Sequence, residues 1–239
     1  MFCQIRFQVN DIAGKKRFCY GAAQQNGTTH VNFVMVLIKA IFTYLQQLKK
    51  TVFNALDALE VLQTRNSAPR LTGSVPGDAL NEMLKAGLRA PDHAQLRPWR
   101  IVVVEGEGRD RLGALFARAK LTSNPDESAE ALAKLRGKPM RAPVIIVVAA
   151  RITEHPKVPE IEQVLSAGAV AQNILNAAHA LGYGAMWRTG SMAFDTVVRE
   201  GLGFDDNHRI VGFLYVGEVD GRRKVLPELN PDDFVTRWY

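Results

Sequence analysis

The pattern of hydrophobic and polar positions becomes regular from residue 57 onward. Over residues 78–88 and 160–181, apolar side chains recur at every third or fourth position, which is typical of amphipathic helices. Residues 144–150 are instead a continuous apolar run, which predicts a strand covered on both faces. We expect shorter helices after Asp57 and at residues 110–120, 127–137 and 194–201, and further strands at residues 101–105, 185–188 and 209–219.

Two aspartates precede predicted helices. Asp57 and Asp78 are expected to cap them, since a carboxylate at this position accepts hydrogen bonds from free backbone N–H groups. The helix over residues 160–181 is apolar on several sides, so we expect it at the centre of the domain or in a subunit interface. The tail, residues 221–239, ends in Phe234, Val235, Trp238 and Tyr239. Because it is this apolar, we expect it to dock on its own subunit or on a partner.

Residues 1–56 follow a different pattern. Residues 1–30 show no sustained period and are expected to be irregular. The apolar run at residues 31–48 is interrupted by Lys39 and Gln46 and is shorter than the roughly 20 residues that cross a bilayer, so no membrane span is expected. Three interpretations are open: a helix on a membrane surface, a helix that packs on the rest of the chain, and upstream sequence outside the functional protein.

The last interpretation is favoured because composition, charge and cysteine content change together near residue 55. The net charge of +6 and both cysteines, Cys3 and Cys19, lie in residues 1–56, where seven Lys or Arg face the single acid Asp11. We therefore divide the chain into an N-terminal extension, residues 1–56, irregular with one apolar helix, and a folded domain, residues 57–239.

Residues 57–239 contain 23 basic and 23 acidic residues, so the domain has no surplus of positive charge for a nucleic-acid backbone. It has no cysteine for a disulfide, a thiolate nucleophile or a metal site, which fits the reducing cytoplasm. Its histidines are scattered, and no metal site is expected. His179 reads as a satisfied or exposed helical residue, and His208 as a solvated turn residue.

The candidate chemistry is that of an anion site beside an aromatic ring. Residues 86–99, where Pro91 and Pro98 stiffen the connection, contain two guanidinium groups, a carboxylate, an imidazole and an indole. Among the histidines, only His93 has such neighbours. Arg65, Ser67 and Arg70 supply guanidinium and hydroxyl donors suited to phosphate. Taken singly, Arg65 and Arg70 are better explained as charges that complement a helix dipole. Trp187-Arg188-Thr189 is equally explained as a core indole beside a surface arginine.

Three ordered motifs give the pattern more weight. They are Arg-x-Ser-x-x-Arg from Arg65, Arg-Ala-Pro-Asp-His-x-x-x-x-Pro-Trp from Arg89, and Gly-x-Gly-x-x-Trp-Arg-Thr-Gly from Gly182. Together they resemble the FMN-dependent nitroreductase family, and most of all its small YdjA-type members. The resemblance covers residues 57–239 and implies an α+β homodimer: a three-layer α/β/α fold around a mixed, mainly antiparallel sheet, with FMN at the subunit interface.

The resemblance also implies roles for individual residues. Arg65, Asn66 and Ser67 would bind the phosphate and ribityl end of FMN, and Trp187, Arg188 and Thr189 would line the flavin. Arg89 and His93 would come from the other subunit. Many members have a second arginine where Asn66 stands, so a weaker phosphate contact is expected there.

The implied activity is that of a cytoplasmic NAD(P)H nitroreductase. FMN would carry the chemistry with no catalytic protein group, taking a hydride from NAD(P)H at N5 and passing two electrons to a nitroaromatic, a quinone or a similar acceptor in a ping-pong scheme. Two alternatives are another flavin-dependent reductase or oxidase on the same fold, and a flavin-binding protein without enzymatic activity.

Overall fold

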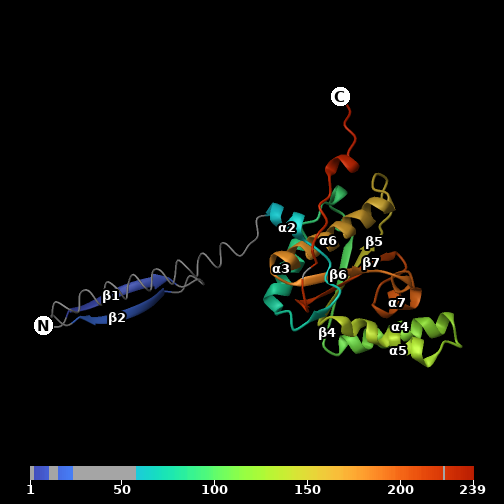
Figure 1. Ribbon diagram of the computed structural model, residues 1–239, viewed down its shortest axis with the longest axis horizontal. Coiled ribbons are helices and arrows are strands. Elements are labelled where there is room, and N and C mark those ends of the chain that lie inside the picture. Colours follow the sequence, from blue (N-terminus) through green and yellow to red (C-terminus); the bar gives the residue numbers. More distant parts are fainter. Residues whose placement is uncertain (1–2, 11–15, 24–57, 223) are drawn as a thin grey trace. The chain divides into compact units, whose positions relative to one another are not determined.

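The central strand β5 (Val144–Arg151) organises an antiparallel sheet in the computed structural model (Figure 1). It pairs along one edge with β4 (Trp99–Glu105) and along the other with β7 (His208–Val219). β6 (Gly184–Arg188) pairs with the opposite edge of β7, and the short β3 (Leu71–Thr72) pairs with the end of β7. In the described part of the chain these five strands form one sheet, whose strand pairs are all antiparallel.

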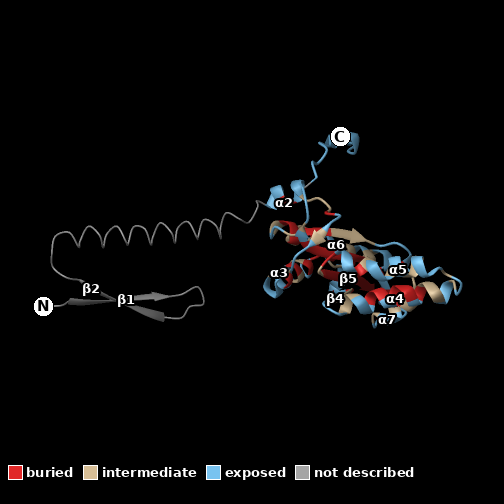
Figure 2. Ribbon diagram, turned by 60° about the horizontal axis from the view of Figure 1, so that its bottom comes forward, coloured by how far each residue is buried: buried red, intermediate tan, exposed pale blue. Residues whose placement is uncertain are grey.

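Helices cover both faces of this sheet because the side chains of β5 alternate between two apolar cores. Val144, Ile146 and Val148 pack with α3 (Gly77–Gly87) and α6 (Glu160–Ala180). Ile145 and Val147 pack on the other face with α4 (Gly108–Ser123) and α7 (Thr196–Gly201). In Figure 2 the buried residues follow the sheet and the helix faces turned toward it.

The three-layer α+β fold that the family resemblance implied is therefore confirmed. The remaining elements are short or peripheral. They are α2 (Ala58–Thr64), α5 (Ala129–Gly137), which packs on α4, and the 3-10 turns η1 (His93–Gln95), η2 (Lys138–Arg141), η3 (Ser191–Ala193) and η4 (Pro231–Asp233).

The residues that cap the helices differ in part from those that were expected. Asp78 was wrongly predicted as a cap, because α3 begins one residue earlier and Asp78 lies inside its first turn. Asp57 lies outside the described residues. The observed caps are Ser128 on α5, which accepts from the Ala131 N–H at 3.2 Å, and Asp195 on α7.

The structure describes residues 58–222 and 224–239 in full, and residues 3–10 and 16–23 by their backbone. The chain divides into two compact units, Met1–Asn54 and Ala55–Tyr239. The predicted apolar helix at residues 31–48 falls outside the described residues. Within those that are described, no helix is long and apolar enough to cross a membrane.

The N-terminal unit corrects the expectation that residues 1–30 are irregular. β1 (Cys3–Asn10) and β2 (Lys16–Ala23) form an antiparallel pair in which Cys3 lies opposite Ala23. The physical signal was the strict alternation of apolar and polar residues from Cys3 to Asn10, which is the period of a strand.

The C-terminal tail does not dock on its own domain. Phe234 is 74% exposed and Trp238 is 98% exposed, so the expected contact with the same subunit is absent for these residues. The other half of that expectation, docking on a partner, stays a prediction.

Candidate functional site

The segment after α2 lies against β6. Ala68 N–H donates to the Ala185 carbonyl at 3.0 Å, and Ser67 forms an isolated parallel bridge with Ala185. At the end of α2, Thr64 Oγ1 lies 3.0 Å from Nε2 of His179, which is buried in the last turn of α6. These contacts hold the half-buried Arg65, Asn66 and Ser67 beside the first residues of β6. Of the two alternatives expected for His179, satisfied or exposed, the structure shows a buried residue with a polar contact to Thr64.

At the other end of β6, Trp187 and Arg188 face opposite sides of the sheet. The Trp187 side chain packs on the α6 side, and its Nε1 donates to the Val211 carbonyl at 3.2 Å. Arg188 lies on the α4 side, with its guanidinium carbon 5.6 Å from the centroid of the Tyr215 ring. Neighbouring strand residues alternate faces, so the bulk of the two side chains lies on opposite sides of the sheet, while both residues line one pocket at the end of β6. Thr189 follows them in an exposed position.

Arg89 and His93 form a separate group. Arg89 is exposed just after α3. Near the end of that helix, the Ala86 carbonyl accepts a hydrogen bond from Asn173 Nδ2 of α6 at 3.3 Å. His93 Nδ1 lies 2.7 Å from Glu162 Oε2, at the start of α6. The loop after His93 is strained, because three non-glycine residues have positive φ: Ala94 (59°), Gln95 (54°) and Arg97 (46°). Such backbone strain clusters at functional sites.

The two groups are far apart within one chain. Glu162, the contact of His93, and His179, the contact of Thr64, lie 17 residues apart on α6. At a rise of 1.5 Å per residue, this is about 25 Å along the helix axis. One copy of the chain therefore does not bring His93 to the segment that holds Arg65.

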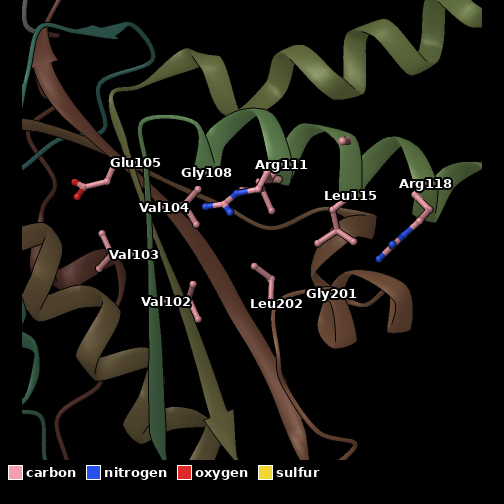
Figure 3. Close-up of a pocket in the computed structure, with 12 residues that line it drawn as sticks. Val102, Val103, Val104, Glu105, Gly108, Arg111, Leu115, Arg118, Gly201 and Leu202 are labelled. Atoms are coloured by element: carbon pink, nitrogen blue, oxygen red, sulfur yellow. The ribbon is translucent and has the colours of Figure 1, made fainter.

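The cavities show which of the predicted site residues line a pocket. A cavity of about 730 Å³ lies between β4, α4 and α7 and contains none of the predicted residues (Figure 3). A pocket of about 370 Å³ contains Trp187, Arg188 and Thr189, together with Lys138 and Arg141 of η2. Sequence reasoning missed these two basic residues, because they lie far from Arg188 along the chain and belong to no motif.

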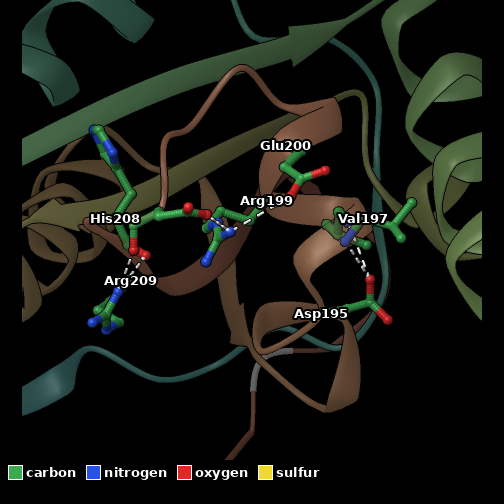
Figure 4. Close-up of polar contacts among 8 residues, drawn as sticks. Asp195, Val197, Arg199, Glu200, His208 and Arg209 are labelled. Carbon is green, nitrogen blue, oxygen red and sulfur yellow. Dashed lines mark hydrogen bonds and ion pairs between the residues drawn. The ribbon is translucent and has the colours of Figure 1, made fainter.

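A second polar region surrounds α7 (Figure 4). Arg199 pairs with Asp206 and lies 3.6 Å from Glu200, while Arg209 Nε donates to Glu160 Oε1 at 3.0 Å. The prediction that His208 is solvated is wrong: the residue is 6% exposed and stacks on Phe204, because it opens β7 with its ring turned into the core. Burial lowers the pKa of His208, Asp205 opposes the shift, and Arg100 and Arg151 add to it.

No group of three or more His, Cys, Asp or Glu side chains suited to a metal ion occurs within residues 58–222 and 224–239. The predicted site residues offer arginine guanidinium groups, hydroxyls and an aromatic ring. Such a donor set suits a phosphate-bearing aromatic ligand.

Comparisons with known proteins identify the family to which this chain is similar. Residues 71–218 match the model of the Nitroreductase family. "Putative NAD(P)H nitroreductase YdjA" of Escherichia coli K12 is 44% identical over 185 residues, which are 76% of this chain and 99% of that protein. "Putative NAD(P)H nitroreductase" of Haemophilus influenzae is 34% identical, with the same coverage of 76% and 99%.

Solved structures share the fold. A nitroreductase-like family protein from Bacillus cereus superposes with a TM-score of 0.65 at 26% identity, over 76% of this chain and 95% of that one. A nitroreductase with bound FMN from Bacteroides fragilis gives a TM-score of 0.59 at 22% identity, over 77% of this chain and 100% of that one.

Proposed function

Because this chain belongs to the nitroreductase family, we propose that it is an FMN-dependent NAD(P)H oxidoreductase whose two sites are each built from two copies of the chain. The observation that carries the proposal is the placement of Arg65, Asn66 and Ser67 against β6, with the aromatic end of that strand beyond them. The cysteine-free domain fits a cytoplasmic enzyme.

The residues beside β6 fit the phosphate of FMN. Within the described residues, the guanidinium of Arg65 has no ion-pair partner and the hydroxyl of Ser67 has no hydrogen-bond partner, so both are available to an oxyanion. Guanidinium binds phosphate through short, charge-assisted hydrogen bonds. The Asn66 amide, 3.5 Å from the Thr64 carbonyl, offers a weaker contact than an arginine would.

The residues at the end of β6 suit the flavin ring. Trp187 offers a flat indole on the α6 side, and Thr189 is exposed next to it. Arg188 would contribute only its main chain, because its side chain lies on the other face of the sheet.

A second copy would complete the site. On α6, Ile161 is 60% exposed and Leu165 is 63% exposed on one apolar stripe, and Leu62 of α2 is 59% exposed. A two-fold contact is self-complementary, so two antiparallel α6 helices would bring the start of one beside the end of the other. Arg89 and His93 of one copy would then approach Arg65 of the other, which one chain alone does not achieve.

When bound, FMN would supply two-electron hydride-transfer chemistry between NAD(P)H and a nitroaromatic, a quinone or a similar acceptor. The chain's own task is binding and orientation. Arg65 and Ser67 hold the phosphate, Trp187 packs against the ring, and Arg89 and His93 of the second copy close the site from the opposite side. No side-chain nucleophile is required of the protein.

The visible spectrum of the purified protein tests this function. We expect the absorbance of oxidised flavin, its loss on anaerobic addition of NADH or NADPH, and its return with a nitroaromatic or a quinone. A protein that binds no FMN would overturn the proposal. A flavin that NADH and NADPH both leave oxidised would instead indicate a flavin-binding protein without this activity.

A further inference from the structure

The turn that contains His93 (residues 92–97) has a strained backbone that polar contacts hold in place. Three of its non-glycine residues have positive φ, a conformation that is unfavourable for residues with a Cβ. Inside the turn, Asp92 Oδ2 accepts a hydrogen bond from the Arg97 N–H at 2.7 Å. The Arg97 carbonyl accepts from Arg100 Nη1 at 3.3 Å. These contacts join the turn to itself and to the start of β4, but they do not fix the ring of His93.

Glu162, in the first turn of α6, makes the contact that reaches this ring. Its Oε2 lies 2.7 Å from Nδ1 of His93. Within residues 58–222 and 224–239, this is the one hydrogen bond that joins a side chain of the turn to a different element. The side chain of His93 is 54% exposed, so a ligand or a second copy of the chain can reach it.

The contact also decides which nitrogen of the imidazole carries the proton. An ionised carboxylate only accepts hydrogen bonds, so Nδ1 of His93 donates to Glu162. The remaining ring nitrogen, Nε2, is then an acceptor in the neutral ring and a donor in the charged ring. It has no hydrogen-bond partner within the residues that the structure describes, so it is the atom available to a ligand.

We propose that Glu162 is a positioning residue of the FMN site. It orients the ring of His93 and keeps a proton on Nδ1, so that Nε2 is presented to FMN on the second copy. This inference rests on the proposed function, in which His93 of one copy approaches Arg65 of the other. Because the turn is strained, loss of the contact with α6 would let His93 leave this orientation.

Glu160 provides a matched comparison in the same helical turn. Its Oε1 accepts from Arg209 Nε at 3.0 Å, and it makes no hydrogen bond with His93 in the described structure. Removing either carboxylate takes one negative charge from the start of α6. Charge alone would therefore strengthen the binding of the FMN phosphate in both variants. A positioning role predicts the opposite sign for Glu162 only.

NMR spectroscopy of the purified protein reads the imidazole directly. Long-range couplings between ring protons and ring nitrogens distinguish the two neutral tautomers, and the signals of His93 are identified by their loss in His93→Ala. At about pH 8.5, well above the ordinary pKa of histidine, we expect the Nδ1–H form in the wild type and in Glu160→Ala. Glu162→Ala should shift the ring toward the Nε2–H form, which histidine favours in water. The same tautomer in wild type and Glu162→Ala would overturn the proposal.

Release of FMN on dilution of the loaded protein, followed by flavin fluorescence, measures the consequence. Glu162→Ala should bind FMN about fivefold more weakly, which is the upper end for one exposed ion pair. Glu162→Gln should lie between this variant and the wild type, because the amide oxygen can still accept from Nδ1. Glu160→Ala should bind FMN at least as tightly as the wild type. In a His93→Ala background, Glu162→Ala should have no further effect.

Unchanged FMN binding in Glu162→Ala, or an equal loss in Glu160→Ala, would overturn the proposal. A further loss when Glu162→Ala is added to His93→Ala would overturn it as well, because Glu162 would then act by a route other than His93. A wild type that binds no FMN would refute the proposed function and this role together. The flavin spectrum of the wild type therefore distinguishes failure of the proposed function from failure of the positioning role alone.

Discussion

The imidazole of His208 is enclosed at the start of β7, stacked on Phe204 with ring centroids 5.2 Å apart. Its Nδ1 is buried without a hydrogen-bond partner in the described structure. Burial disfavours the charged ring, so the pKa of His208 in the folded protein lies below its ordinary value of 6.5. The unfolded chain therefore takes up a proton first as the pH falls.

This linkage predicts a loss of stability in mild acid. The contribution of His208 is fully present above the unfolded pKa of 6.5 and decreases as the pH falls from there toward the folded pKa. The free energy of unfolding, measured with urea at about pH 7.5 and about pH 5.5, should decrease more for the wild type than for His208→Leu. Equal decreases in the two proteins would contradict the assignment.

Arg65 is the residue on which cofactor retention is expected to depend most. Arg65→Ala removes an unpaired guanidinium from the segment beside β6 without disturbing the Ala68–Ala185 hydrogen bond. The loss of a charged hydrogen bond should cost about 1.5–3 kcal/mol of FMN binding, while the unfolding midpoint of the FMN-free protein stays near that of the wild type. The ratio of flavin to protein after gel filtration is the measurement.

Arg136→Ala is the control for this variant, since it removes an arginine from α5. Its flavin content should match that of the wild type. A fully flavin-loaded Arg65→Ala protein would show that the phosphate lies elsewhere.

Among the elements, α4 and α5 lie so close together that a methyl group does not fit between them. A Cβ at Gly113 would overlap the carbonyl group of Arg136, whose Cα would be 3.1 Å away. Alanine favours a helix over glycine by about 1 kcal/mol, but overpacking against rigid backbone costs about 1–3 kcal/mol. Gly113→Ala should therefore lower the free energy of unfolding, as measured by urea denaturation.

Gly108→Ala, in the first turn of the same helix, is the comparison. Its Cβ would meet Val104 Cγ1 at 3.4 Å, an ordinary contact, so its stability should stay close to that of the wild type. An equal loss in both variants would show that the contact with Arg136 does not limit the packing of α4 on α5.

Elements with a long local pattern could be predicted from the sequence, and those that depend on a distant partner could not. β5 and α6 extend over eight and 21 residues of recognisable pattern, and both lie where they were expected. β3 has only two residues and exists because β7 pairs with it, so no local signal marks it. The positive φ angles after His93 occur at alanine, glutamine and arginine, and such a conformation cannot be predicted from these residue types.

At the scale of the whole molecule, the exposed stripe on α6 is expected to hold two copies together. Leu165→Glu places a charge in the middle of this stripe, and a two-fold contact would bring the two new carboxylates close together. Light scattering should show the mass of one chain for the variant and of two chains for the wild type, and the variant should retain less FMN. Phe194→Glu replaces an 82% exposed residue next to η3 and should remain dimeric. A wild-type protein with the mass of a single chain would refute the two-copy site.

The candidate site could be predicted only motif by motif. The segment from Arg65 to Ser67 and the end of β6 come together through the contact of Ser67 with Ala185, which joins residues far apart in the sequence. Trp187 and Arg188 point in opposite directions because strand residues alternate faces. Lys138 lies in the same pocket as Arg188 because of tertiary packing. No pattern within a single motif contains that information.

The length of α6 has a consequence for genetics. Suppose that His93 and Arg65 of one site belong to different chains. The Arg65→Ala and His93→Ala proteins are then each defective alone. A heterodimer of the two variants nevertheless has one site with both native residues. Random pairing in a cell that makes equal amounts of both would restore about a quarter of all sites. Complementation between two inactive alleles would thus reveal the shared architecture without a structure of the assembled pair.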